Sequence, residues 1–124
     1  MSAEEDFAAL AGDYLDDMAR RHPDAATGLG DHRFDDRLPD LSAAALAAER
    51  QALDRFAARL TAIDTTALTP ELGVDAAMLS QSIARRVFEL DELREHTWNP
   101  LLANPGSAIY DLLVRDFAPR RSRR

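Results

Sequence analysis

The segment from His22 to Ser42 constrains the fold more than any other part of the chain, because it is the one long segment without apolar residues at helical spacing. It contains two of the six prolines, two of the five glycines and a dense run of charges of mixed sign. Pro23 pushes His22 out of the α region and so ends the preceding helix. The chain is therefore expected to form separate helices joined by one long connection.

This connection is predicted to be an ordered loop that crosses the end of a helical layer. Residues 27–30, Thr-Gly-Leu-Gly, favour a tight turn because glycine adopts positive φ without strain. Apolar and charged residues are interleaved along the loop, which predicts that the apolar side chains are buried anchors and that the charged ones pair. Leu29, Phe34, Leu38 and Leu41 are expected to be the buried anchors. The structural candidates in this loop are Leu29, Gly30, Asp31, Arg33, Phe34, Asp35, Asp36 and Arg37.

The remaining sequence is typical of amphipathic helices, with apolar residues at spacings of three, four and seven. Helices are predicted over residues 3–21, 43–63, 70–97 and 108–117. Ser2 with Glu5 forms a capping box, and Ser42, Thr69 before Pro70, and Ser107 mark the other helix starts. The third helix would be a rod of roughly 40 Å. The fold class predicted is all-α, an antiparallel helical bundle of about four helices with one long ordered loop after the first.

Each predicted helix carries one apolar stripe, and we expect these stripes to form the core. The stripe residues are Phe7, Leu10, Tyr14, Leu15 and Met18, then Leu46, Leu53, Phe56, Leu60 and Ile63, then Leu72, Ala76, Leu79, Ile83, Val87, Leu90 and Leu93 or Arg94, and finally Ile109, Leu112, Leu113 and Phe117. Trp98 is expected to plug the core at a helix end. Residues 1–119 are predicted to form one helical domain, and residues 120–124 a basic disordered tail.

The charge distribution argues against two classes of partner. The net charge is −7, and because four of the fifteen arginines lie in the last five residues, residues 1–119 carry 11 Arg against 22 acids, or −11. A body this acidic repels nucleic acid phosphates and anionic membrane surfaces, so neither partner is expected. The N-terminus lacks a basic segment followed by an apolar run, and no apolar run approaches membrane-spanning length. A cytoplasmic location is expected.

No catalytic, cofactor-binding or metal-binding residue is assigned from the residues alone. The three histidines, His22, His32 and His96, lack the paired spacing of a zinc site, and His22 and His96 are expected at helix ends. The aspartate run lacks the calcium-loop pattern, and residues 27–30 match no phosphate-binding fingerprint. The abundant acids are expected on solvated helix faces.

Several short pieces nonetheless occur in a familiar order. They are Phe7 with Tyr14-Leu15; His22-Pro23, Ala26-Thr27 and Leu29-Gly30-Asp31; residues 35–42; Leu60 with Ile63-Asp64; Leu68; Asp75 with Leu79; Trp98-Asn99-Pro100; and residues 115–119. This series, which covers nearly the whole chain up to Pro119, resembles the N-terminal part of the bacterial domain-of-unknown-function 885 family. The resemblance implies long helical proteins similar to zinc metallopeptidases of the H-E-x-x-H type.

The resemblance also implies what this chain would lack. It contains no H-E-x-x-H, so no ligand or base is transferred to any residue, and zinc is expected only in full-length family members. The chain would be the N-terminal helical segment of such a protein, a wall or lid beside the cleft, inactive by itself, with the downstream catalytic part as its partner. The turn into an arginine-rich end after Pro119 suggests a truncated or frame-shifted open reading frame, or a fragment. The alternative is a stand-alone helical interaction module or small dimer that self-associates.

Overall fold

The computed structural model of the chain describes residues 2–115, and this part is helical without a strand. The α-helices are α1 (Ala3–Arg21), α2 (Pro23–Gly28), α3 (Ala43–Thr61), α4 (Pro70–Phe88) and α5 (Gly106–Val114). Short helical turns lie between them: η1 (Thr65–Ala67), η2 (Glu89–Leu93), η3 (Glu95–Thr97) and η4 (Pro100–Ala103). The predicted all-α fold is confirmed.

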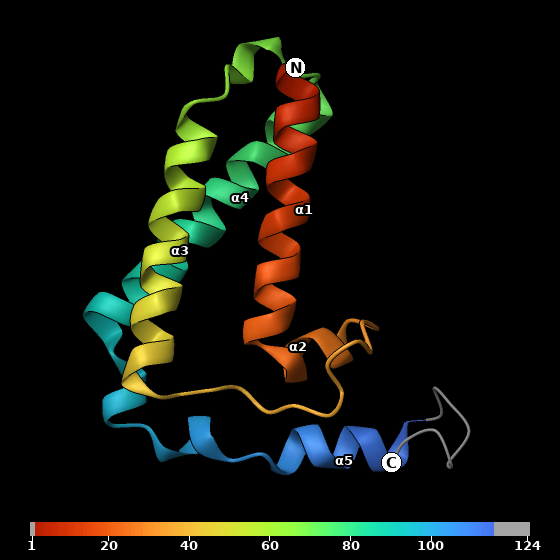
Figure 1. The fold of residues 1–124 in the computed structure, drawn as a ribbon, viewed down its shortest axis with the longest axis vertical. Coiled ribbons are helices and arrows are strands. Elements are labelled where there is room, and N and C mark those ends of the chain that lie inside the picture. The colour runs from red at the N-terminus through yellow and green to blue at the C-terminus, as the bar shows by residue number, and fades with distance from the viewer. Residues whose placement is uncertain (1, 116–124) are drawn as a thin grey trace.

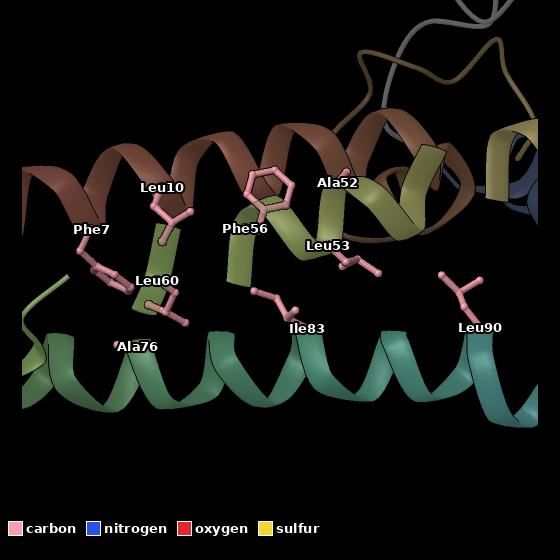
Figure 2. Packing of buried hydrophobic residues seen from close by; sticks show 9 residues of the cluster. All are labelled: Phe7, Leu10, Ala52, Leu53, Phe56, Leu60, Ala76, Ile83 and Leu90. Atoms are coloured by element: carbon pink, nitrogen blue, oxygen red, sulfur yellow. The ribbon is translucent and has the colours of Figure 1, made fainter. Parts of the chain in front are cut away.

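The three long helices α1, α3 and α4 form the body of the molecule, and α4 runs back along α3 after a short connection (Figure 1). Their predicted stripes meet in the core, which contains Phe7 and Leu10 of α1 and Leu53, Phe56 and Leu60 of α3. Figure 2 shows these side chains and Ala52 of α3 between α1 and α4, with Ala76 and Ile83 of α4 and Leu90 of η2 on the opposite side of the core. The rings of Tyr14 and Phe56 meet edge to face at 5.5 Å. Leu15, predicted in the stripe of α1, is instead 65% exposed.

Local capping fixes the starts of the three long helices, as predicted. The Ser2 hydroxyl accepts from the Glu5 N–H at 3.2 Å while the Glu5 carboxylate accepts from the Ser2 N–H at 3.1 Å. The Ser42 hydroxyl accepts from the Ala45 N–H at 3.2 Å. The Thr69 hydroxyl accepts from the Leu72 N–H at 3.4 Å, and Pro70 occupies the first turn of α4. These bonds satisfy backbone donors that a helix start otherwise leaves unpaired.

The third predicted helix, residues 70–97, is not one rod, and this expectation was wrong. The α-helix ends at Phe88, and η2 continues as a single π-helical turn closed by the Arg94 N–H donating to the Glu89 carbonyl at 2.9 Å. Arg94 then takes the left-handed conformation with φ +49° and turns the chain. Trp98 is not a core plug: its side chain is 63% exposed, and its indole N–H donates to the Leu93 carbonyl at 2.9 Å.

The fourth predicted helix also differs from expectation. It spans Gly106–Val114, begins after Pro105 without a side-chain cap, and contributes no residue to the core cluster. Ile109 and Leu113, expected inward, are 48% and 73% exposed. Helix α5 instead lies across the end of the body near α2 (Figure 1), where its Ile109 and Leu112 face the 24–38 segment across a cavity of about 200 Å³. Phe117 and the predicted tail 120–124 lie outside the described residues.

Candidate functional site

The predicted loop 22–42 begins with a helix rather than with a turn. Residues Pro23–Gly28 form α2, and its buried residues are Pro23, Ala26 and Thr27. Because α2 supplies these anchors, the later apolar residues are not needed for that purpose. The expected burial of Leu29 and Leu38 was wrong, since they are 90% and 54% exposed, and Leu41 is exposed as well. Gly30 has φ +94°, so a glycine-specific backbone does occur where the turn was predicted.

The loop charges pair with each other and with α1. The Arg33 guanidinium contacts the Asp31 carboxylate at 2.8 Å and the Asp16 carboxylate of α1 at 2.9 Å. The hydrogen bonds from Arg33 hold the pKa of Asp31 below its usual range. Arg37 lies 3.9 Å from Asp36. The Arg33 pairs thus tie the middle of the loop to the side of α1.

Phe34 is only half-buried, and it is held between two cations rather than plugged into the core. The guanidinium carbons of Arg33 and Arg37 lie 5.2 and 5.3 Å from the centre of its ring. Asp35, next to it, accepts from the buried Thr27 hydroxyl at 2.6 Å and contacts His32 Nδ1 at 2.9 Å. The Thr27 hydroxyl is buried and also lies 3.0 Å from the Pro23 carbonyl, so it links the loop to α2 and is not open to a substrate.

A buried ion cluster was not predicted, and it lies where the loop meets the body. Glu49 of α3 is only 3% exposed. One of its carboxylate oxygens lies 2.9 Å from His22 Nε2 and 2.8 Å from Arg86 Nε, and the other lies 3.0 Å from Arg86 Nη2. Arg86 also contacts Glu89 at 3.2 Å. The cluster therefore joins the α1–α2 junction, α3 and α4 through one carboxylate.

The electrostatics of this cluster follow from its hydrogen bonds. Burial raises the pKa of Glu49, but hydrogen bonds from His22 and Arg86 lower it by more, and the pKa falls to about 2. The hydrogen bonds to Glu49 raise the pKa of Arg86. Glu49 is thus an anion at neutral pH with both oxygens occupied. It is a poor general base, because a base needs a free lone pair and a pKa near the working pH.

A sequence signal for this cluster existed. Glu49 lies three residues after Leu46 and four before Leu53, within the apolar stripe of α3. A carboxylate at a stripe position predicts a buried charge, and a buried charge needs a partner. The sequence does not say which of the arginines supplies that partner, because Arg86 is 37 residues away.

An open cavity of about 390 Å³ lies beside the cluster. Its walls come from the end of α1, the loop, the start of α3 and the end of α4. The charged lining residues are Asp17, Arg20, Arg21, His22, Arg37, Asp40, Glu49 and Arg86. Arg21 pairs with Asp17 at 2.7 Å, and Asp40 accepts from the Ser42 N–H at 2.9 Å. Both of these interactions are local, one within α1 and one just before α3, and neither supplies a nucleophile.

The three histidines do not converge. His22 contacts Glu49, His32 contacts Asp35, and His96 is exposed in η3. Within residues 2–115 no group of three or more His, Cys, Asp or Glu side chains is arranged to hold a metal ion. None of the described helices combines the length and apolar character that crossing a membrane requires.

Comparison with known proteins identifies the family. A family profile described as "Bacterial protein of unknown function (DUF885)" matches residues 23–123. The chain belongs to the DUF885 family. Neither the curated proteins nor the solved structures contain a match. The DUF885 match starts at the first residue of α2, the fully buried Pro23, and includes both Glu49 and Arg86. The ion cluster therefore lies largely within the DUF885 region.

Proposed function

We propose that this DUF885 chain is a helical packing element that lies against a catalytic segment of a zinc-peptidase-like protein and has no peptidase activity by itself. The observation that carries the proposal is the apolar arm, defined as residues 95–114. This arm follows the turn at Arg94 and runs across the end of the three-helix body to α5 (Figure 1). None of its residues belongs to the core cluster.

The arm exposes more apolar surface than a solvated segment needs. Seven of its large apolar side chains are between 44% and 73% exposed, namely Trp98, Leu101, Leu102, Ile109, Tyr110, Leu113 and Val114. Exposed apolar side chains, where they gather into a patch, mark interaction sites in soluble proteins. An arm that packs against further helices would remove this surface from water, at about 25 cal/mol per Å².

The chemistry of the chain agrees with a supporting role. A zinc peptidase needs about three protein ligands, an open position for water and a base that accepts its proton. The sequence has no H-E-x-x-H, and the carboxylate of Glu49 is already fully paired. The peptidase-like character of the partner rests on the resemblance of the chain's ordered motifs to that family.

The first experiment tests activity and metal content. We expect no peptide cleavage and no stoichiometric zinc from the purified chain. One equivalent of tightly held zinc that is lost on mutation of His22, His32 or His96 would overturn the proposal. A weak, substoichiometric metal content would agree with it, because scattered carboxylates bind metals loosely.

The second experiment tests the arm. The chain is mixed with a catalytic segment of a DUF885 protein that carries H-E-x-x-H, supplied as a separate polypeptide, and complex formation and peptide cleavage are measured. We expect binding that Leu101→Asp together with Leu113→Asp abolishes. Leu15→Asp, at a similarly exposed position on α1, serves as the matched control and should bind normally. Binding that survives in the arm variant would refute the assignment to the arm.

A further inference from the structure

Helix α4 carries a second stripe on the side away from the core. It consists of Glu71, Val74, Met78, Gln81, Arg85 and Phe88, which we call the outer stripe. Val74, Met78 and Phe88 are 59%, 63% and 51% exposed, and the Arg85 side chain is 80% exposed. The core-facing stripe of the same helix, Ala76 and Ile83, is buried by α1 and α3. Helix α4 therefore has one covered and one uncovered stripe.

The six residues of the outer stripe lie on one side of α4 along the whole helix. They follow one another at intervals of three, four, three, four and three residues. Alternating intervals of three and four residues keep side chains on one side of a helix, where a second helix can lie against them. Four of the six residues are uncharged, and these fill the middle of the outer stripe and one end. The narrow shape of the outer stripe favours a helical partner over a flat surface.

The charges of the stripe indicate which helix fits. Glu71 lies seven residues before Met78, and Arg85 lies seven residues after it. If a second α4 lies antiparallel with a two-fold axis at Met78, Glu71 of each copy faces Arg85 of the other. A parallel pair would place like charges opposite each other, which is unfavourable. In its own chain Arg85 has only a long contact of 3.6 Å with Glu89, which leaves guanidinium donors available.

We infer that the outer stripe of α4 binds a second copy of this chain in an antiparallel, two-fold symmetric dimer. The contact is isologous, so each copy supplies the same residues and the interface closes at two. The inference goes beyond the proposed function and does not depend on it, because the apolar arm takes no part in the contact. The two surfaces can therefore be tested separately.

The test is sedimentation equilibrium of the full chain over a range of concentrations. We expect association to a species of twice the 13.7 kDa chain mass. Met78→Glu should lower the dimerisation affinity at least tenfold, because it would bury an unpaired carboxylate at the contact. Leu113→Glu, an equally drastic change on the arm, should leave it unchanged. A chain that is monomeric throughout, or one whose association responds to Leu113→Glu and not to Met78→Glu, overturns the inference.

A charge exchange tests the orientation of the helices. Glu71→Arg and Arg85→Glu should each weaken the dimer, and the double variant should restore most of the lost affinity because both cross-pairs are re-formed with reversed sign. Both side chains are exposed, so neither substitution should disturb folding of the monomer. The urea midpoint of each variant checks this. Failure of the double variant to recover affinity would refute the antiparallel register.

A crosslink gives an independent readout. The chain contains no cysteine, so Met78→Cys introduces a single thiol close to the proposed axis. Two cysteines bridge when their Cα atoms approach to about 4.4–6.8 Å. Under mild oxidation Met78→Cys should give a disulfide-linked dimer much faster than Leu113→Cys does. Equal rates for the two variants would contradict the two-fold axis at Met78.

Discussion

Replacement of Glu49 by glutamine is the sharpest test of how the loop is attached to the body. The carboxylate accepts from His22 and receives two hydrogen bonds from Arg86, and it is almost fully shielded from water. Glutamine preserves the shape of the side chain but removes the charge. Its amide NH2 group would also face an N–H donor of His22 or Arg86 where the carboxylate now accepts. Among the described residues, Arg86, whose side chain is 26% exposed, would then keep only Glu89 as a charged partner.

The size of the effect follows from the pKa of Glu49. Its pKa falls from 4.5 to about 2 on folding, and a pKa difference of one corresponds to about 1.4 kcal/mol, so the charged form contributes about 3 kcal/mol to stability at neutral pH. Loss of one partner from a buried pair costs a similar amount, roughly 3–5 kcal/mol. This is a large share of the roughly 5–15 kcal/mol that stabilises a typical domain.

The pH dependence has a definite sign. The unfolded chain binds the proton more readily than the folded one, so the contribution of Glu49 is complete above pH 4.5 and is lost as the pH falls toward 2. The free energy of unfolding of Glu49→Gln should therefore be about 3 kcal/mol below that of the original chain at pH 7, and the two should converge between pH 4.5 and 2. Other carboxylates titrate in both proteins and cancel in this difference.

Urea unfolding followed by circular dichroism measures both quantities. Glu89→Gln is the matched control, because Glu89 contacts the same arginine at 3.2 Å but its side chain is 34% exposed; it should cost at most about 1 kcal/mol. Equal stability of the Glu49→Gln variant and the original chain at pH 7 would refute the reasoning. A difference that stays constant down to about pH 2.5 would show that packing, and not charge, is responsible.

Other substitutions separate the roles of the remaining elements, each measured by the free energy of unfolding. Phe56→Ala should cost about 3–5 kcal/mol, because the ring is buried in the core against Tyr14. Phe34→Ala should cost less than half as much as Phe56→Ala, because the ring is only half-buried in the loop. Ser2→Ala should cost about 1 kcal/mol through loss of the capping box. Arg94→Gly should stabilise the chain by about 1 kcal/mol, because glycine adopts φ +49° without strain; destabilisation would show that the arginine side chain matters more than its backbone.

The core and the helix starts could be predicted because both depend on neighbouring residues. The 3-4-7 spacing of Leu53, Phe56 and Leu60 places them on one side of α3, whatever lies opposite. The caps at Ser2 and Ser42 bond to an N–H three residues away, so their whole geometry lies within one turn. Such signals need no knowledge of the tertiary structure.

The end of α4 could not be predicted for the opposite reason. Residues 89–93 continue an apolar period that suits an α-helix, and Leu90 is indeed buried. The π turn and the left-handed Arg94 change the direction of the chain without a proline or glycine at the turn. Arg50 of α3 also contacts Asp91 at 3.0 Å, a tertiary pair 41 residues apart. We infer that such tertiary contacts favour the early turn, and nothing local to residues 89–94 encodes it.

An apolar stripe shows that a surface should be covered, but it does not identify the cover. Leu10 and Leu113 both occupy stripe positions of amphipathic helices, yet Leu10 is fully buried and Leu113 is 73% exposed. The difference is that α3 and α4 lie against α1, whereas nothing among the described residues covers the outer side of α5. Helix α4 shows both outcomes at once, with Ile83 inside and Met78 outside. The exposed stripes are therefore apolar residues that the described part of the chain does not cover. The arm and the outer stripe are the surfaces where binding partners should be sought.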